Sequence, residues 1–128
     1  LDVEQIILIY SMISEMTKKA LNSLKHSGRI EELKGALSQK GIMGEVHPAQ
    51  AMCELVENEY IKRLLQNACD SYIRFALATG HFGEKIKEEK EKMTVLLEAG
   101  ELKKVEKSLD SYYKLLAKAV NKERGMNK

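Results

Sequence analysis

The chain has 128 residues, of which 44% are hydrophobic and 31% charged, and its formal net charge is +2. At this length about two-thirds of the unfolded surface can be buried on folding, which fits one compact core. The near balance of 21 basic and 19 acidic residues excludes a disordered acidic chain and a strongly basic nucleic-acid arm. A single proline and no tryptophan favour helices over a β-sandwich or barrel, which need frequent turns.

Two helices are predicted in the first third of the chain. The first covers residues 1–25, because Asp2 and Gln5 have the spacing of a capping box and hydrophobic residues then recur at intervals of three and four. The sequence His26-Ser27-Gly28 interrupts this pattern. A short helix is predicted over residues 29–40, before a glycine-containing segment.

The next predicted helix is long and covers residues 48–79, with Pro48 in the favoured first turn. Unbroken, it would measure about 48 Å. We therefore expect a bend or break near residues 57–59, where Asn58 can cap a new helix. Apolar residues cover nearly half of the circumference of its second half: Tyr60, Ile61, Leu64, Leu65, Ala68, Tyr72, Phe75 and Ala76. This width predicts a largely buried central helix.

Two more helices are predicted, over residues 84–99 and 101–122, and residues 123–128 are expected to be a frayed tail. The first of them begins with charges on almost every side, which indicates a solvated helix supported by pairs of opposite charge. The second has a regular hydrophobic period. Together the pattern predicts an all-α, single-domain bundle of five or six helices.

Cys53 and Cys69 lie in predicted helix without a CxxC neighbour, so neither a zinc site nor a redox pair is expected. We expect both to be small buried residues of a reducing, cytoplasmic protein. No apolar run approaches the ~20 residues of a membrane span, so no membrane partner is expected. The sequence contains no Glu-x-x-His motif and no glycine-rich phosphate loop, and we expect neither a metal nor a cofactor.

Arg74 and His81 stand at the end of the predicted central helix, in the sequence Arg-Phe-Ala-Leu-Ala-Thr-Gly-His. This spacing resembles the Arg…His motif of HEPN ribonucleases, which are all-α bundles that usually work as dimers. The resemblance implies that His81 is the general base for a ribose 2′-hydroxyl and that Arg74 stabilises the phosphate charge. Alternatively, Arg74 lies on the solvent face and His81 helps to begin the next helix.

A line of polar residues follows one side of the predicted central helix at spacings i, i+4, i+7 and i+11: Arg63, Asn67, Asp70 and Arg74. Such a line can bind phosphates or the carboxylates of a partner, because arginine offers a bidentate fork. The alternative is that these residues form the solvent-exposed face of a mostly buried helix. The exposed Asp70–Arg74 ion pair would then contribute little to stability.

Some apolar residues lie off the main stripes of their helices: Ile9, Met12, Met43, Ile73 and Leu77. A homodimer face or a groove for a partner helix would account for them, and Ile73 and Leu77 are the predicted interface residues. The alternative is that the broad central helix buries all of them within one chain.

The sequence thus leads to two functional hypotheses. The first is a non-enzymatic interaction domain, either a homodimer or a small subunit of a larger complex, whose partner is itself or another protein. The second is an RNA-directed helical protein, either a HEPN-like ribonuclease that uses Arg74 and His81 or an RNA-binding subunit.

Overall fold

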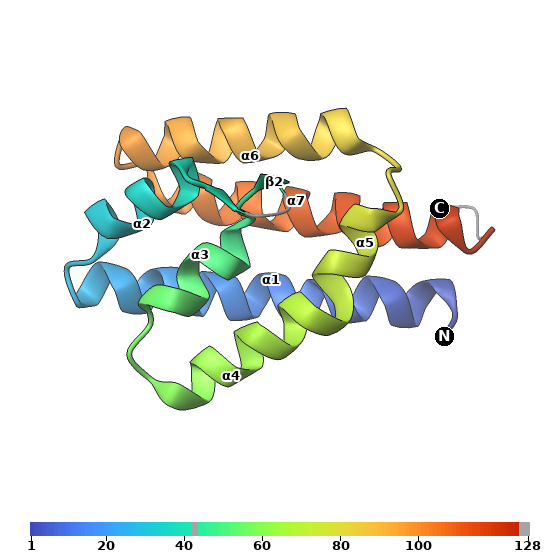
Figure 1. Cartoon of the computed structure of the whole chain (residues 1–128), viewed down its shortest axis with the longest axis horizontal. Helices are drawn as coiled ribbons and strands as arrows, with labels where there is room; N and C mark the ends of the chain where they lie inside the picture. Colours follow the sequence, from blue (N-terminus) through green and yellow to red (C-terminus); the bar gives the residue numbers. More distant parts are fainter. Residues whose placement is uncertain (42–43, 126–128) are drawn as a thin grey trace.

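A computed structural model describes residues 1–41 and 44–125, with the side chains of residues 40–41 and 44–45 left aside. It confirms an all-α, single-domain bundle (Figure 1). The helices are α1 (Val3–His26), α2 (Ile30–Ser38), α3 (Pro48–Leu55), α4 (Glu59–Ala68), α5 (Arg74–Ala78), α6 (Gly83–Glu98) and α7 (Leu102–Glu123). A π-helical turn, η1 (Cys69–Ile73), joins α4 to α5.

The three long helices α1, α6 and α7 run side by side, and the shorter helices cover one face of this layer (Figure 1). The core lies between the two groups. Every long helix contributes fully buried large side chains, among them Ile6, Leu21, Met93, Leu109 and Tyr112, and α4 contributes Leu65. Helix α7, in the middle of the layer, has buried residues along its whole length.

The predicted capping box at the start of α1 is confirmed. The Gln5 backbone N–H donates to the Asp2 carboxylate at 2.8 Å, and the Asp2 N–H donates to the Gln5 side chain at 2.9 Å. These bonds satisfy two of the backbone donors that a helix start leaves open. They fix where the apolar first half of α1 begins.

The segment over residues 48–79, in which a bend or break was expected near residues 57–59, is interrupted there. Helix α3 ends at Leu55, and Asn58 caps α4 by accepting hydrogen bonds from the backbone N–H groups of Tyr60 and Ile61 at 2.9 and 3.1 Å. The chain therefore changes direction after Val56, and α4 leads back across α1.

The prediction of a largely buried central helix is wrong for α4 and α5. With η1 they pack on α1, α3 and α7 through one side, which carries Leu65, Ala68, Cys69, Ile73 and Ala76. Their opposite side exposes more than a third of five large apolar side chains: Tyr60, Leu64, Tyr72, Phe75 and Leu77. Helical periodicity reports how wide an apolar arc is, but it does not report whether the rest of the chain covers that arc.

The π turn η1 changes the register of the helix that contains it. A π turn accommodates one extra residue and so rotates the helix that follows by about 100° relative to a regular α-helix. The Tyr10 hydroxyl of α1 donates a 2.8 Å hydrogen bond to the Tyr72 carbonyl in this turn. The two tyrosine rings also meet edge to face, with 6.5 Å between their centroids.

A short antiparallel pairing joins β1 (Lys40–Gly41) to β2 (Gly44–Glu45), and its register places Lys40 opposite Glu45. The sequence has no strand signal for this pair, and α2 ends at Ser38 rather than at residue 40. Met43, predicted to lie off the hydrophobic stripes, is outside the described residues. The predicted tail overlaps α7 by one residue, Glu123, and its last three positions are also outside the described part.

Candidate functional site

Helix α1 has an uncharged first half, which extends from Gln5 to Ser14. One side of this stretch is buried in the core through Ile6, Tyr10 and Ile13. The opposite side is also apolar but exposed: Ile7 is 46% exposed, and Leu8 and Met12 are each 59% exposed. The exposed side also carries Gln5 and Ser11, but no charge. A helix stretch with so little polar surface is normally covered on more than one side, whereas the described chain covers only one.

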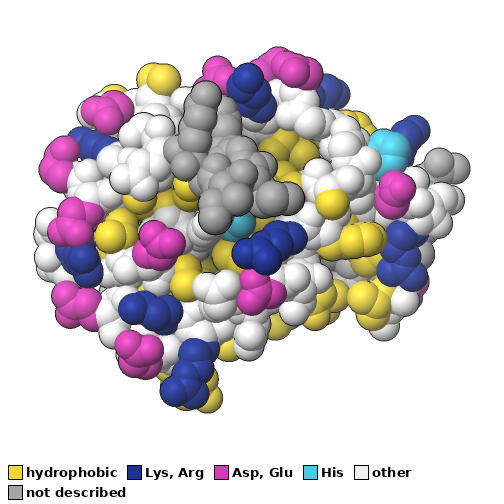
Figure 2. All heavy atoms as spheres, in the orientation of Figure 1, with side chains coloured by type: hydrophobic (Ala, Val, Ile, Leu, Met, Phe, Trp, Pro, Cys, Tyr) yellow, Lys and Arg dark blue, Asp and Glu magenta, His cyan; other side chains and the backbone are white. Residues whose placement is uncertain are grey.

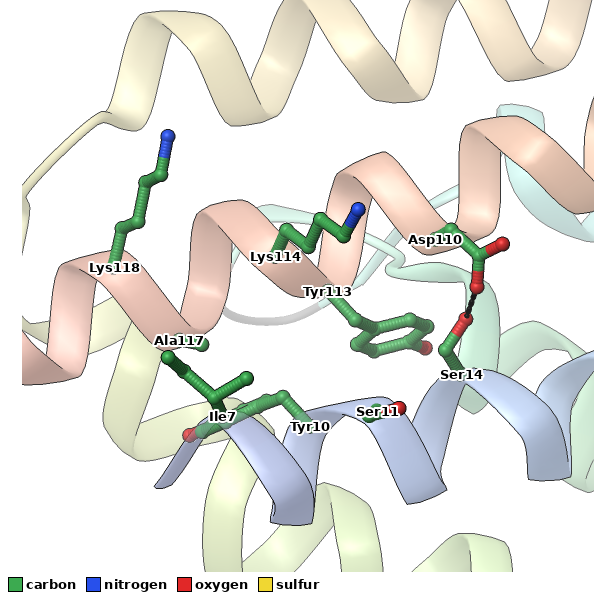
Figure 3. Close-up of a pocket in the computed structure, with 9 residues that line it drawn as sticks. All are labelled: Ile7, Tyr10, Ser11, Ser14, Asp110, Tyr113, Lys114, Ala117 and Lys118. Atoms are coloured by element: carbon green, nitrogen blue, oxygen red, sulfur yellow. Dashed lines mark hydrogen bonds between the residues drawn. The ribbon is translucent and has the colours of Figure 1, made fainter. Parts of the chain in front are cut away.

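A groove of about 390 Å³ lies beside this face, between α1 and α7 (Figure 3). Residues of both helices line it: Ile7, Tyr10, Ser11 and Ser14 from α1, and Asp110, Tyr113, Lys114, Ala117 and Lys118 from α7. Figure 3 shows Ile7 close to Ala117 and the Tyr113 ring reaching from α7 toward α1. The walls are thus mostly apolar, and Ile7 belongs both to the groove and to the exposed face of α1.

A polar cluster closes one end of the groove. The Ser14 hydroxyl donates to the Asp110 carboxylate at 2.7 Å, as drawn in Figure 3, and Lys18 Nζ lies 2.9 Å from the same carboxylate. Burial raises the pKa of Asp110, but the hydrogen bonds from Lys18 and Ser14 outweigh it and hold the pKa below its usual value. Asp110 therefore stays ionised at neutral pH and ties α7 to α1.

Exposed charges of both signs border the groove. Glu4 and Glu15 are exposed on α1, where Glu15 lies 3.2 Å from Lys18, and Lys114 and Lys118 are exposed on α7. In Figure 3 both lysine side chains extend from α7 on its side away from α1. The floor is the ring of Tyr113, which is buried.

No protein-family model, curated protein or solved structure gives a significant match to this chain. The functional argument therefore depends on the geometry of the chain itself.

Arg74 and His81 each have a local partner of their own. Arg74 is exposed and its Nη2 lies 3.6 Å from the Asp70 carboxylate, whereas His81 Nε2 lies 3.4 Å from the Glu123 carboxylate of α7. Helix α5 ends at Ala78, and Gly80 adopts a left-handed φ of +75° between the two residues. No described contact joins Arg74 to His81.

The polar line Arg63, Asn67, Asp70 and Arg74 lies on exposed surface. The π turn falls within this line, so the regular spacing that aligned its four members is not kept through to Arg74. Asp70 also accepts hydrogen bonds from Gln66 Nε2 at 3.1 and 3.2 Å. Its carboxylate is therefore shared between two neighbours on the same helix.

Ile73, predicted as an interface residue, is a core residue with 0% of its surface exposed. The regular helical wheel misplaced it, because the π turn changes which residues face inward. Leu77 is 37% exposed and lines a cavity beside α6. Of the other residues off the stripes, Ile9 is partly buried and Met12 is exposed.

Both cysteines are free and buried. Burial raises the pKa of the Cys69 thiol to about 12 and also raises that of Cys53. A thiol that stays protonated is a poor nucleophile. In the described part of the chain no three His, Cys, Asp or Glu side chains gather as a metal site, and no described helix is long and apolar enough to cross a membrane.

The sequence reasoning missed Ile7, Leu8, Lys114 and Lys118. Two signals could have found them. The first is the run of ten uncharged residues from Gln5 to Ser14, which leaves no charged side on this part of α1. The second is the pair of lysines four residues apart on α7, beside small Ala117. The adjacency of these two helices, however, is visible only in the folded chain.

Proposed function

We propose that the chain is a non-enzymatic helical interaction domain that forms a homodimer through its α1–α7 face. This face comprises the exposed side chains of Ile7, Leu8 and Met12 together with the groove beside them. The observation that carries the proposal is the uncharged half of α1, whose side away from the core exposes Ile7, Leu8 and Met12. Exposed apolar patches of this kind mark interaction sites.

A second copy of the chain fits this face because a ridge and a groove lie next to each other on it. Leu8 and Met12 form the ridge, one turn apart on α1. In a two-fold dimer the same surface is used by both partners, so the ridge of one chain can enter the groove of the other. Each groove is then filled by apolar side chains and each ridge is buried.

The charges at the border of the face also favour a two-fold arrangement. Glu4 and Glu15 lie on α1, and Lys114 and Lys118 lie on α7. Rotation of a second copy by half a turn allows the acidic side chains of one chain to face the lysines of the other. A stable dimer buries about 800 Å² per partner, which is about a tenth of the 7764 Å² accessible surface of this chain.

The first prediction concerns the oligomeric state. Analytical ultracentrifugation over a concentration series should give a species of twice the 14.5 kDa chain mass for the unaltered protein. The double variant Leu8→Glu with Met12→Glu should sediment as a monomer, because it places two carboxylates in the apolar ridge. Its far-UV circular dichroism should be unchanged, since both side chains are exposed in the single chain.

The matched control is Val95→Glu on α6. Val95 is 67% exposed and apolar like the ridge residues, but it lies on a helix that does not border the groove. This variant should remain a dimer. A monomeric unaltered protein, or equal loss of the dimer in both variants, would contradict the proposal.

A charge exchange tests the two-fold arrangement. Lys114→Glu with Lys118→Glu should weaken the dimer about tenfold, through repulsion across the interface. Adding Glu4→Lys and Glu15→Lys should restore much of the lost affinity. If the second pair weakens the dimer further, the acidic and basic borders do not face one another.

An RNA-directed function leads to a different result. A ribonuclease that uses Arg74 and His81 would cleave labelled single-stranded RNA at low salt and lose this activity on His81→Ala. A binding subunit would shift the RNA on the same gel and lose affinity on Arg63→Ala or Arg74→Ala, with a steep dependence on salt. Either result would replace the non-enzymatic interaction domain as the main function.

A further inference from the structure

Helix α7 presents a row of lysines on its exposed side. From Lys103 to Lys122 seven of its side chains are exposed, and six of these are lysines while the seventh is Ser111. Most of them follow one another at intervals of three and four residues, along one line of the helix: Lys107, Ser111, Lys114, Lys118 and Lys122. The four lysines of this line form what we call the lysine row. The row is about 22 Å long, because each helical residue adds about 1.5 Å.

The lysine row forms no ion pair with the residues that the structure describes. Asp110 lies on the same helix and feels the charge of Lys114, but its carboxylate binds Lys18 of α1 at 2.9 Å. Lys118 stands four residues from Lys114 and four from Lys122, and like charges at this spacing repel one another on a helix. A negatively charged ligand along the row would relieve this repulsion.

An open trough of about 490 Å³ lies between α6 and the middle of the row. The described residues that line it are Lys85, Glu88, Glu89 and Lys92 from α6, and Ser111, Lys114, Leu115 and Lys118 from α7. Figure 3 shows the side chains of Lys114 and Lys118 extending from α7 toward α6. Glu89 is held against α7, because its carboxylate accepts a 2.6 Å hydrogen bond from the Ser108 hydroxyl. Four lysines thus line the trough against two glutamates, of which Glu88 is the exposed one.

The row lies on the face of the long-helix layer that the shorter helices leave uncovered. Figure 2 shows the covered face, where acidic and basic side chains are interspersed. The lysine row carries charge of one sign along its whole length, which gives a stronger local potential than a mixed surface does. Because α7 is the middle helix of the layer, α1 and α6 flank the row on its two sides.

The shape and chemistry of the trough favour a single nucleic-acid strand among polyanions. Leu115 is the one apolar residue among the described lining residues and is half-buried, so a peptide would find few pockets for its side chains. Neighbouring helices pack about 8–10 Å apart, so the recess between α1 and α6 is too narrow for a duplex or a flat membrane surface. A single strand is narrow and carries one charge at every repeat. No aromatic side chain is among the described lining residues, so the contacts are to phosphates rather than to stacked bases.

We propose that the lysine row and the trough bind single-stranded nucleic acid through its phosphates, without preference for sequence. Lys114 and Lys118 contact the strand from α7, and Lys92 contacts it from α6. Lys122 extends the contact at one end of the row. This binding differs from the RNA-directed alternative above, because neither arginine of α4 and α5 takes part. It is also independent of the proposed dimer, because Lys92 and Lys122 do not line the α1–α7 groove.

Fluorescence anisotropy of a labelled oligothymidylate tests the proposal. Titrations at several sodium chloride concentrations should give saturable binding that weakens steeply as salt rises. Contact with about four phosphates of a single strand predicts a slope of about −3 for the logarithm of the affinity constant against the logarithm of the salt concentration. No saturable binding at low salt, or an affinity that does not depend on salt, would overturn the proposal.

A pair of matched variants makes the assignment specific. Lys92→Gln with Lys122→Gln should weaken binding about tenfold at low salt and make the salt slope less steep. Lys19→Gln with Lys87→Gln removes the same charge from exposed positions of α1 and α6 outside the trough, and should bind nearly as the unaltered chain does. All four lysines are exposed, so the far-UV circular dichroism should be unchanged in both variants. Equal weakening in the two variants would overturn the proposal, because it would indicate a general effect of net charge.

The class of ligand and the place of binding are tested separately. Polyglutamate of matched charge should compete weakly with the oligothymidylate, and competition as strong as that of unlabelled oligothymidylate would overturn the assignment to nucleic acid. Arg63→Gln with Arg74→Gln should bind as the unaltered chain does, and a loss of binding there would move the site to α4 and α5 and overturn the proposal. The Leu8→Glu and Met12→Glu variant should keep the same salt slope, so that this site and the proposed dimer can fail independently.

Discussion

His47 combines two structural roles at one position. Its Nδ1 caps α3, and its ring is buried beside Arg74 and Lys90, with a pKa lowered from 6.5 to about 4. The folded chain therefore resists protonation of this ring, whereas the unfolded chain accepts a proton below about pH 6.5. The contribution of the neutral ring is complete above pH 6.5 and is lost as the pH falls toward 4.

This linkage gives a prediction for stability. The free energy of unfolding, measured with urea in chloride buffers, should fall by about 3 kcal/mol between pH 6.5 and 4 through His47 alone. His47→Asn should remove this part of the slope while it preserves the cap. Carboxylates with lowered pKa values, such as Glu32 and Asp110, add to the loss in both proteins, so the difference between the two curves isolates the ring. Curves that run parallel would show that another group titrates.

Asn58 sets where α4 begins, and its role as the N-cap of this helix can be tested directly. Its side chain accepts two backbone hydrogen bonds at the helix start. Asn58→Ala should lower the free energy of unfolding by about 1 kcal/mol, and Asn58→Ser, which can still cap, should lower it by less. Urea denaturation measures both. If alanine and serine are equivalent, the direction change after Val56 is fixed by packing rather than by the cap.

The helices that sequence predicts best are those with regular spacing between clear stop signals. Residues 84–99 and 101–122 were expected to be helical, and the structure has α6 over Gly83–Glu98 and α7 over Leu102–Glu123. Gly100 separates them with a left-handed φ of +75°, which glycine adopts without strain. In both, the period and the stop agree, so the bounds differ by only one residue.

The parts that sequence did not predict depend on contacts between distant segments. The π turn places Ile73 inside, against a regular helical wheel, and the Tyr10 hydroxyl bonds to the carbonyl of Tyr72 from another helix. The candidate dimer face needs α1 and α7 to be neighbours, and the packing of the folded chain places the charge of Lys90 near His47. None of these distances is encoded in local spacing. Periodicity therefore predicted the elements but not the sites that lie between them.

Cys53 on α3 and Cys69 in η1 are free cysteines that lie in the same hydrophobic core but on two different elements. Both thiols are buried and have raised pKa values. Reaction with a coloured disulfide reagent at pH 8 should be slow for both in the folded protein, and urea should make both reactive over the same concentration range as the loss of helix. Early reaction of Cys69 alone would show that the segment containing η1 opens before the rest.

The π turn also gives this helix a tolerance to a change in chain length. Because η1 holds one residue more than a regular helix would, removal of the exposed Ser71 can be absorbed by conversion of the turn to α-helix. The residues after the deletion, among them Ile73 and Leu77, would then keep the faces that they have now. Homologous chains that are one residue shorter at this turn would thus present the same side chains at the same places, although a regular helical wheel would align the two sequences differently.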